Sequence, residues 1–349
     1  MYTTVKSAIM KLDRLQPSPR DRSIRSDSDS SLSNITQMNT IIDSLISLLD
    51  EIKTKRLRLS RSNRDFKKPF ISTWDTRNTN ALSTADNQIK LPLLESGQYF
   101  FRVSWGDGKH DVIRSYDDPA TTHTYDTAGE YTIRIKGICE GWNFNYDNDN
   151  DTGGIDRLKL LSVSSWGNLK ITTSSCFLGC YNLDLASVDD VLDVSGTTDL
   201  RGMFQDCPGL TGINNIEYWD VSHVTRFVAM FEQTYSGPNY TFNADFSLWD
   251  VSKGGDFRYM FRNCRALNFD ASAWHVKSAT LLNGMFNNCV GFTTENYDKL
   301  LIGWAAKDVL PADKNFGGPP VQYTSAALDA RNILLNTWGW SISDGGLQP

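Results

Sequence analysis

Cysteine, histidine and aspartate are the residues of this sequence that could bind a metal ion or act in catalysis. Their spacing tests each of these roles. Among the six cysteines, four stand three residues after a phenylalanine: Cys180, Cys207, Cys264 and Cys289. Cys176 and Cys180 form a C-x3-C pair without a second pair or a nearby histidine, which does not fit a zinc site. We expect reduced thiols that are buried at a repeated packing position.

The four histidines, His110, His123, His223 and His275, lie in no metal-ligand or nucleophile motif. The sequence also lacks G-x-S-x-G, a Walker loop and H-E-x-x-H. We expect Asp107 and His123 to fix turns by hydrogen bonding. These observations predict a protein that is not an enzyme.

An acidic stretch, NYDNDNDTGGID, places Asp147, Asp149 and Asp151 at alternate positions before Gly153. Alternating carboxylates open the loops that bind calcium through hard oxygen ligands. An EF-hand loop would continue with glycine at 152 and glutamate at 158, where the chain has Thr152 and Leu158. Two interpretations remain, a solvated connector and a calcium site, and no other cofactor is expected.

A repeat positions most of the cysteines and aromatics. WDVSHVTRFVAMF (219–231) is followed by WDVSKGGDFRYMF (249–261) and WHVKSATLLNGMF (274–286). The repeated phenylalanines are separated by 27, 27, 30 and 25 residues: Phe177, Phe204, Phe231, Phe261 and Phe286. A period in the twenties is typical of a solenoid in which each copy adds one short strand and stacking supplies the core. The sequence predicts such a solenoid over 158–292, with its aromatics inside.

One interval of the repeat is longer than the others. The extra residues lie in EQTYSGPNYTFNADFSL, which carries the aromatics Tyr235, Tyr240 and Phe242, and Thr234 stands where other copies have cysteine. A solenoid accepts an insertion as a surface loop. Two interpretations remain for these aromatics: they contact a ligand as a recognition loop, or they pack back onto the body.

Different segments flank the predicted solenoid. Alternating apolar and polar residues on both sides of the turn Trp105-Gly106-Asp107-Gly108 predict a β domain over 70–145. Residues 146–157 form an acidic linker loop before the first repeat. A C-terminal cap over 293–349 is expected to contain a helix through ALDARNILLN, which Ser325 can N-cap and Gly339 can end.

The first 69 residues predict an anchoring and oligomerisation segment with a helix at about 33–54. Six apolar residues recur at the a/d spacing of a coiled coil: Ile35, Met38, Ile42, Leu45, Leu49 and Ile52. Ile41, Ile46 and Leu48 widen this stripe, which favours a homotrimer or docking on another protein. A helix packed against the chain's own β domain is the alternative.

A basic run over 53–68 follows, with eight basic residues and one acidic residue. We expect it to meet an acidic protein surface or to serve as a solvated tether. Nucleic acid is not the expected partner, because no recognition fold accompanies the charge.

The net charge of the chain is −6, but its distribution is uneven. Residues 1–70 carry 14 Lys/Arg against 8 Asp/Glu, so the remainder is strongly acidic. The N-terminus has no apolar signal region, and no window reaches the roughly 18 apolar residues of a membrane span. The sequence therefore predicts a chain that is neither exported through a signal peptide nor inserted in a membrane.

Two family resemblances follow from these motifs and together cover about residues 70–346. SWGDG followed by HTYDTAGEYTIRIKG resembles the PKD-type, immunoglobulin-like β-sandwich. The WDVS and MFxxC copies resemble the BspA-like leucine-rich repeats of bacterial surface proteins, also described as mycoplasma-type surface-lipoprotein repeats. Leu192, Thr234 and HVKS at 275–278 depart from the repeat. The resemblance implies a mainly β chain without catalytic residues that serves adhesion or display.

The sequence is compatible with three functions. The first is a virion-associated phage structural protein, a fibre or capsid decoration, in which residues 1–69 bind other virion proteins. Its β domain and solenoid would then meet a host-surface glycan or protein from the virion surface. The alternative is a bacterial cell-surface adhesin. An enzyme that acts on surface glycans ranks third, because no acid pair is evident.

Overall fold

The computed structural model describes residues 68–144, 155–234 and 240–349, together with Ser44. Backbone contacts divide the chain into two compact units, Met1–Leu59 and Ser60–Pro349. The predicted helix at 33–54 therefore lies outside the described residues except for Ser44, and the basic run except for Lys68.

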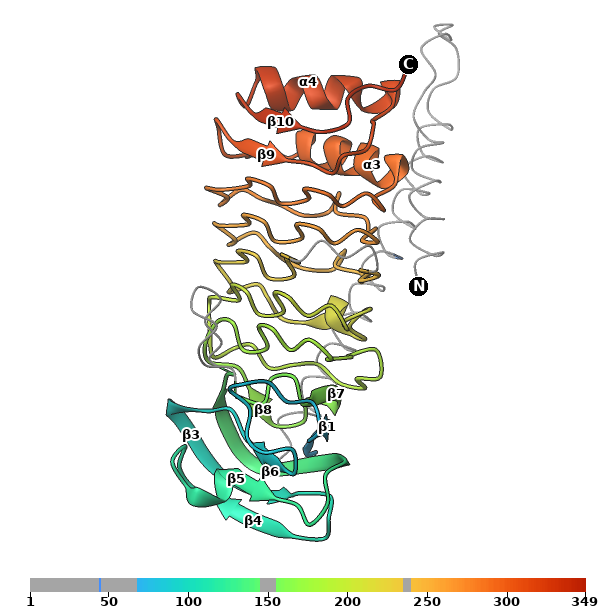
Figure 1. Cartoon of the computed structure of the whole chain (residues 1–349). Helices are drawn as coiled ribbons and strands as arrows, with labels where there is room; N and C mark the ends of the chain where they lie inside the picture. The colour runs from blue at the N-terminus through green and yellow to red at the C-terminus, as the bar shows by residue number, and fades with distance from the viewer. Residues whose placement is uncertain (1–43, 45–67, 145–154, 235–239) are drawn as a thin grey trace, which may run out of the picture. The chain divides into compact units, whose positions relative to one another are not determined.

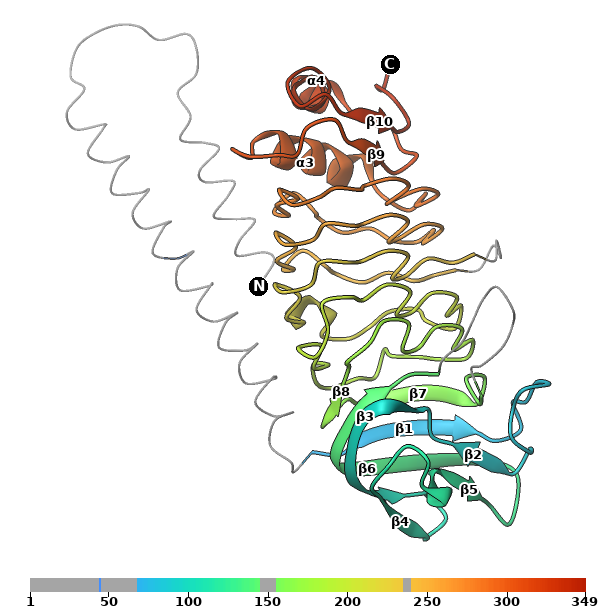
Figure 2. The same ribbon diagram turned by 90° about the vertical axis from the view of Figure 1, so that its left-hand side faces the viewer.

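Alternating apolar residues build a largely antiparallel sheet in the order β4-β3-β6-β1-β7, with β8 beside β6 (Figures 1 and 2). Its inward side chains, which include Trp74, Phe101, Val103, Ile133 and Ile135, are at most 2% exposed. β2 and β5 pair with each other as a separate antiparallel ribbon. The strands are β1 (Phe70–Asp75), β2 (Gln88–Lys90), β3 (Leu93–Ser104), β4 (His110–Ile113), β5 (Thr122–Thr124), β6 (Glu130–Trp142), β7 (Leu160–Ser165) and β8 (Leu169–Lys170).

The predicted turn at 105–108 joins β3 to β4. The Trp105 backbone N–H donates to the Lys109 carbonyl at 3.1 Å, and Asp107 Oδ1 accepts from the Lys109 backbone N–H at 2.9 Å. The second carboxylate oxygen of Asp107 lies 2.9 Å from Nε2 of His123, whose ring stacks on Trp105 at 4.7 Å. The expected role of Asp107 and His123 in fixing this turn is confirmed.

The first repeat is part of the same sheet. β7 pairs with β1 in antiparallel register, and β8 pairs with β6 in parallel register, with Cys139 opposite Leu169. Both strands lie within the residues that the sequence assigned to the solenoid, which was expected to begin at 158. The β domain and the first coil therefore share backbone hydrogen bonds and a continuous core.

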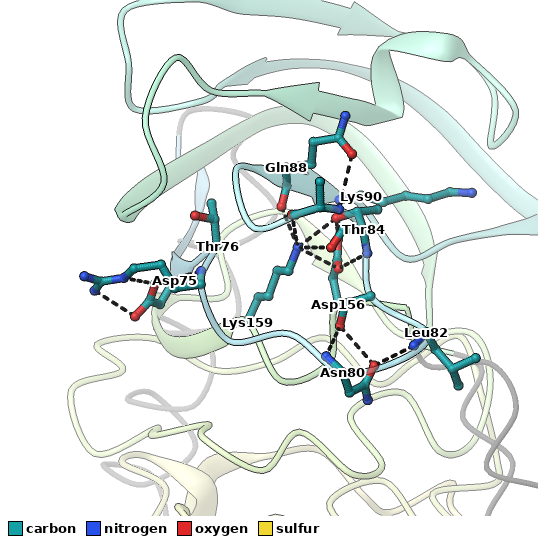
Figure 3. A network of polar contacts seen from close by, with 12 residues as sticks. Asp75, Thr76, Asn80, Leu82, Thr84, Gln88, Lys90, Asp156 and Lys159 are labelled. Atoms are coloured by element: carbon teal, nitrogen blue, oxygen red, sulfur yellow. Dashed lines mark hydrogen bonds and ion pairs between the residues drawn. The ribbon is translucent and has the colours of Figure 1, made fainter.

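A buried ion pair between Lys159 and Asp156 lies at the junction of the β domain and the first coil (Figure 3). Lys159 and Asp156 are 0% exposed, and Lys159 Nζ lies 3.0 Å from Asp156 Oδ1. The ammonium also donates to the carbonyls of Ala85 and Gln88, at 2.8 Å each, and to Thr84 Oγ1 at 2.8 Å. Burial lowers the pKa of Lys159, although Asp156 opposes that shift.

The same contacts correct one sequence prediction. A solvated connector was expected over 146–157, yet Asp156 is fully buried and Arg157 is 8% exposed. Asp156 accepts hydrogen bonds from the backbone N–H groups of Thr84 and Lys90, at 3.0 and 2.7 Å. These two donors come from a segment about 70 residues away, so the sequence near Asp156 gave no sign of its burial. Residues 145–154 lie outside the described residues.

Successive repeats stack coil upon coil toward the C-terminus (Figure 1). The backbone N–H of each of the first four repeated phenylalanines donates to a carbonyl of the next coil, as from Phe177 to Met203 at 3.0 Å and from Phe204 to Met230 at 2.8 Å. Parallel bridges connect Asp199, Arg226, Asp256 and Leu281 in sequence. The contacts between coils are therefore parallel and recur at each repeat.

The backbone of these coils differs from the expected short strands. The residue two positions before each repeated phenylalanine has a positive φ of 52° to 63°. This backbone angle bends the chain into stacked turns, which form isolated bridges instead of strands. The occupants of this position are Ser175 (φ 59), Gly202 (φ 58), Ala229 (φ 52), Tyr259 (φ 57) and Gly284 (φ 63). Apolar periodicity could not reveal this, because it reports which side chains are buried and not the backbone angles. The prediction of a mainly β chain is confirmed.

The repeated phenylalanines form one stacked column, as the sequence predicted. Adjacent ring centroids lie 5.4 to 5.7 Å apart along Phe177, Phe204, Phe231, Phe261 and Phe286. Each of these rings is at most 1% exposed. Offset or stacked aromatic pairs at this distance add stabilisation beyond the area they bury. The column is part of the buried core of the coils, together with the repeat tryptophans Trp166, Trp219, Trp249 and Trp274.

The cysteines form a second column beside the rings. The thiol of Cys207 donates to the Phe177 carbonyl at 3.1 Å, and the thiol of Cys289 donates to the Phe261 carbonyl at 3.0 Å. All six cysteines are free and buried, as expected. Burial raises the pKa of every thiol in the column, so the neutral form is favoured.

A helical segment follows the last coil. α3 (Thr294–Ala305) begins at Thr293, whose hydroxyl accepts from the Asn296 N–H, and Trp304 Nε1 donates back to the Ala271 carbonyl at 3.0 Å. β9 (Asn315–Gly317) and β10 (Ser341–Ser343) form a parallel pair. The remaining elements are α4 (Leu328–Asn336) and the short 3-10 helices η1 (Pro119–Thr121), η2 (Ile216–Tyr218) and η3 (Ser325–Ala327).

The predicted N-cap of the last helix is wrong. Ser325 was predicted to be the N-cap, but the N-cap of α4 is Ala327, which makes no side-chain cap hydrogen bond. Thr324 instead caps η3, the 3-10 turn that leads into α4, and accepts from the Ala326 backbone N–H at 3.2 Å. The Thr324 hydroxyl in turn donates to Asp298 in α3 at 2.5 Å. Gly339, with φ 69°, follows the end of α4 as predicted.

Candidate functional site

The third coil breaks the cysteine column and creates a polar cluster. Thr234 occupies the cysteine position, and its hydroxyl donates to the two carboxylate oxygens of Asp206 at 2.8 and 2.7 Å. The Thr234 backbone N–H adds a third hydrogen bond to Asp206 at 2.6 Å. Asp206 itself has a positive φ of 54° and is 6% exposed. Threonine in place of cysteine on the third coil is therefore accompanied by a carboxylate on the second coil, Asp206, which accepts its hydrogen bonds.

A second buried carboxylate lies beside this pair. The side chain of Glu232 is 4% exposed, and its carboxylate forms an ion pair with the guanidinium of Arg262 on the fourth coil. Gln205 Nε2 donates to Glu232 Oε2 at 3.2 Å. Burial raises the pKa of Glu232, and the charge of Arg262 only partly offsets that shift. The cluster therefore holds a carboxylate whose ionised form is disfavoured.

Tyr259 is the aromatic member of this cluster. At its backbone position, the equivalent residues of the other coils are small: Ser175, Gly202, Ala229 and Gly284. A positive φ is strained for a bulky residue, and such strain persists where the surroundings enforce it, often at functional sites. The guanidinium of Arg262 lies 4.4 Å from the centre of the Tyr259 ring. A methyl group added at Gly284 would come within 2.6 Å of the same ring.

We call these six residues the Glu232 cluster: Gln205, Asp206, Glu232, Thr234, Tyr259 and Arg262. Its charged and aromatic groups come from three successive coils, and Tyr259, Arg262 and Gln205 are partly exposed. Within the cluster, Thr234 is the residue next to 235–239, the part of the insertion that lies outside the described residues. Chemically it offers hydrogen-bond donors, acceptors and an aromatic ring in a fixed arrangement.

Two of the three aromatics of the predicted recognition loop are buried. Phe242 is 2% exposed and stacks on Phe231 at 5.1 Å, and Tyr240 is 9% exposed. These two side chains pack onto the body, as the second interpretation held, and do not present an open contact surface. Tyr235 lies outside the described residues.

Sequence reasoning noted Thr234 but missed Glu232, Tyr259 and Arg262. Tyr259 could have been singled out from the sequence, because the aligned copies of the repeat have serine, glycine or alanine at its position. Nothing comparable marked Glu232 or Arg262, since residues after the phenylalanine vary freely between copies. Their pairing depends on the stacking of coils, which places residues 30 positions apart side by side.

Several predicted sites fall on residues that the structure does not describe. These are the oligomerisation residues Ile35, Met38, Ile42, Leu45, Leu49 and Ile52, and the calcium residues Asp147, Asp149 and Asp151. Over the described ranges, no group of three or more His, Cys, Asp or Glu side chains could hold a metal ion. Within the same ranges, no helix has both the length and the apolar character needed to cross a bilayer.

Comparison with known families adds one finding. Residues 171–299 match the profile of a family described as Mycoplasma protein of unknown function, DUF285. The match runs from the first coil into α3 and includes the whole Glu232 cluster. It agrees with the mycoplasma-type repeats that the sequence resembled, whereas the PKD-type and leucine-rich-repeat resemblances stay predictions. Neither the curated proteins nor the solved structures give a match.

Proposed function

We propose that the chain is a non-enzymatic recognition protein whose stacked coils display the Glu232 cluster to a ligand. The observation that carries this proposal is Tyr259, a bulky residue held at positive φ where the other coils have small residues. Both carboxylates of the cluster already accept hydrogen bonds or an ion pair from the chain's own donors. That arrangement suits a fixed binding surface better than proton transfer, which requires a free acid or base.

A glycan is the class of ligand that the cluster supports best, ahead of the host protein that the sequence also allowed. Sugar hydroxyls both donate and accept hydrogen bonds, and the partly exposed Gln205 amide, Arg262 guanidinium and Tyr259 hydroxyl supply both functions. Their positions are fixed by the coil stack, which lowers the entropy lost on binding.

The test is binding of the full-length protein to an array of host-surface glycans. Tyr259→Ala should abolish binding without unfolding the chain, because Ala229 already occupies the same backbone conformation in the third coil. Tyr181→Ala is the matched control, since Tyr181 is 54% exposed on the first coil. Equal glycan binding by the wild type and Tyr259→Ala would refute the role of the cluster.

We further propose that the protein is carried on a phage virion, as a fibre or capsid decoration, and is a homotrimer. The support is the sequence of residues 1–69, with its apolar stripe and basic run. Mass spectrometry of purified virions tests the location. Light scattering of the full-length protein tests the trimer: Ile42→Asp should yield a monomer, and a monomeric wild type would exclude the trimer.

A bacterial cell-surface adhesin is the second candidate, and the family match favours it because that family is described as a Mycoplasma protein. The same coils and the same cluster would then act from a cell. Antibody labelling of intact bacterial cells distinguishes the two: surface labelling without virion association supports the adhesin.

A further inference from the structure

The outer face of the β sheet carries an apolar centre surrounded by cations. Phe100 on β3 is 59% exposed, Val112 on β4 is 42% exposed and Ile138 on β6 is 37% exposed. Phe100 lies directly opposite Ile138 in the strand register. Together with Arg102, Lys136 and Gly137 they line one shallow hollow. We call this surface the β3-β6 face.

Gly137 is one of the residues that line this hollow. Gly137 has φ 130°, a conformation that L side chains rarely adopt, and an added methyl group would lie 2.3 Å from the Phe100 carbonyl oxygen. The outward neighbours of Gly137 along β6 are Lys136 and Ile138. The backbone conformation between this cation and this apolar side chain therefore requires glycine.

Four exposed cations surround this centre: Arg102, Arg114, Arg134 and Lys136. Arg102 and Lys136 stand directly opposite each other on neighbouring strands, and like charges in that position destabilise a sheet. The ion pairs between described residues include none of these four cations. Glu140, the next outward carboxylate along β6, is paired with Lys170 at 3.7 Å. The face therefore has an uncompensated positive charge.

Protection of the sheet edge does not explain this charge. Proteins place lysines and other charges on edge strands to prevent edge-to-edge pairing. Here the edge strands are β4 and β7, yet three of the four cations lie on β3 and β6, which have neighbours on both sides. The destabilising pair of Arg102 and Lys136 lies in the interior of the sheet, where it offers no protection.

We propose that the β3-β6 face is a docking site for an acidic protein segment that also carries apolar side chains. Carboxylates of this partner would meet Arg102, Lys136, Arg134 and Arg114, and its apolar groups would cover Phe100, Val112 and Ile138. Interface centres of this kind are apolar and rich in aromatics and arginine. This site is separate from the Glu232 cluster and does not depend on glycan recognition.

A polypeptide fits this face better than a nucleic acid. Single-stranded nucleic acids bind by stacking bases on the open face of an aromatic ring. The guanidinium of Arg114 lies over the Phe100 ring, 5.7 Å from its centre, and so occupies one of its two faces. Val112 and Ile138 offer no stacking surface, whereas leucine or phenylalanine side chains of a partner would pack against them.

The experiment uses the full-length protein and three labelled probes in fluorescence anisotropy. The first is a 12-residue peptide in which glutamates alternate with leucines, and the second replaces its leucines by serines. The third is a single-stranded DNA oligonucleotide. We expect the leucine peptide to bind about tenfold more tightly than the serine peptide or the DNA, and to weaken about tenfold when salt rises from about 50 to 300 mM.

Variants locate the site. The double variant Arg102→Glu, Lys136→Glu should lose about tenfold in affinity for the leucine peptide, and Phe100→Ser about fivefold. Lys253→Glu and Leu248→Ser are matched controls, because both residues are exposed on the coils, and they should leave affinity unchanged. Absence of peptide binding, equal losses in the controls, or binding of all three probes that ignores Phe100→Ser would each overturn the proposal.

A stability measurement separates docking from a structural role. Replacing Lys136 by threonine removes the like-charge pair and places a β-branched residue in the strand, so the melting temperature should rise or stay equal while peptide affinity falls. A fall in melting temperature in step with affinity would show that Lys136 serves the fold and would also overturn the proposal.

Discussion

The hydroxyl of Thr234 donates to the Asp206 carboxylate at 2.8 and 2.7 Å, at the coil position where Cys207, Cys264 and Cys289 donate to a backbone carbonyl instead. The exchange of cysteine for threonine on one coil is thus linked to a buried aspartate on the coil before it. The pair anchors the chain where the insertion begins.

This link predicts the effect of removing one hydroxyl. Thr234→Val keeps the side-chain shape but withdraws the Oγ1 donor from Asp206, so the free energy of unfolding should fall by about 1 to 3 kcal/mol. Thr234→Ser keeps the donor and is the control, with a smaller loss. Urea denaturation measures both, and equal stability of the valine and wild-type proteins would contradict the pairing.

The phenylalanine column should be the most sensitive part of the coils. The Phe261 ring is fully buried between Phe231 and Phe286, at centroid distances of 5.6 and 5.4 Å. Phe261→Ala should therefore lower the free energy of unfolding by about 3 to 5 kcal/mol. Tyr181→Ala, at an exposed position of the first coil, should change it by less than about 0.5 kcal/mol. Unchanged thermal stability of Phe261→Ala would refute the stacked core.

The buried ammonium of Lys159 should be indispensable at the junction of sheet and coils. Lys159→Met retains much of the side-chain length but leaves the Asp156 carboxylate without its charged partner and removes one donor from the carbonyls of Thr84, Ala85 and Gln88. This loss should cost about 3 to 5 kcal/mol. Lys299→Met removes a partly exposed lysine that pairs with Glu295 at 2.7 Å and should cost at most about 1 kcal/mol. Similar denaturation midpoints for the two variants would argue against this difference.

Glu232 should make stability fall as pH rises. Burial raises its pKa, so below the ordinary glutamate range both the folded and the unfolded chain hold the proton and no penalty exists. As pH passes from that range to the raised pKa, the unfolded chain ionises first and the folded chain loses relative stability. Over this window the wild type should lose stability relative to Glu232→Gln, as measured by denaturation at a series of pH values. A constant difference would exclude the raised pKa.

The cysteines should resist thiol reagents in the folded protein. Burial raises the pKa of Cys176 to about 12 and favours the neutral thiol of the other five. Because the thiolate is the reactive form, labelling should be very slow in native buffer and complete in denaturant. Rapid modification of any thiol before unfolding would show that its coil opens locally.

The repeat could be predicted from the sequence alone, because the spacing of its phenylalanines determines which side chains pack together. A phenylalanine that recurs every 25 to 30 residues can be buried only against its counterparts in neighbouring copies, and the cysteine three residues later follows the same column. The turn at Trp105-Gly106-Asp107-Gly108 was equally local, since glycine and aspartate favour the required backbone angles.

Tertiary structure alone decided the features that depend on register between distant residues. Arg102 and Lys136 are 34 positions apart and oppose each other only through the pairing of β3 with β6, and Glu232 meets Arg262 only through the stacking of coils. The burial of Asp156 likewise follows from donors on the segment before β3. A one-residue shift in any of these registers would separate the partners, and no local pattern in the sequence specifies it.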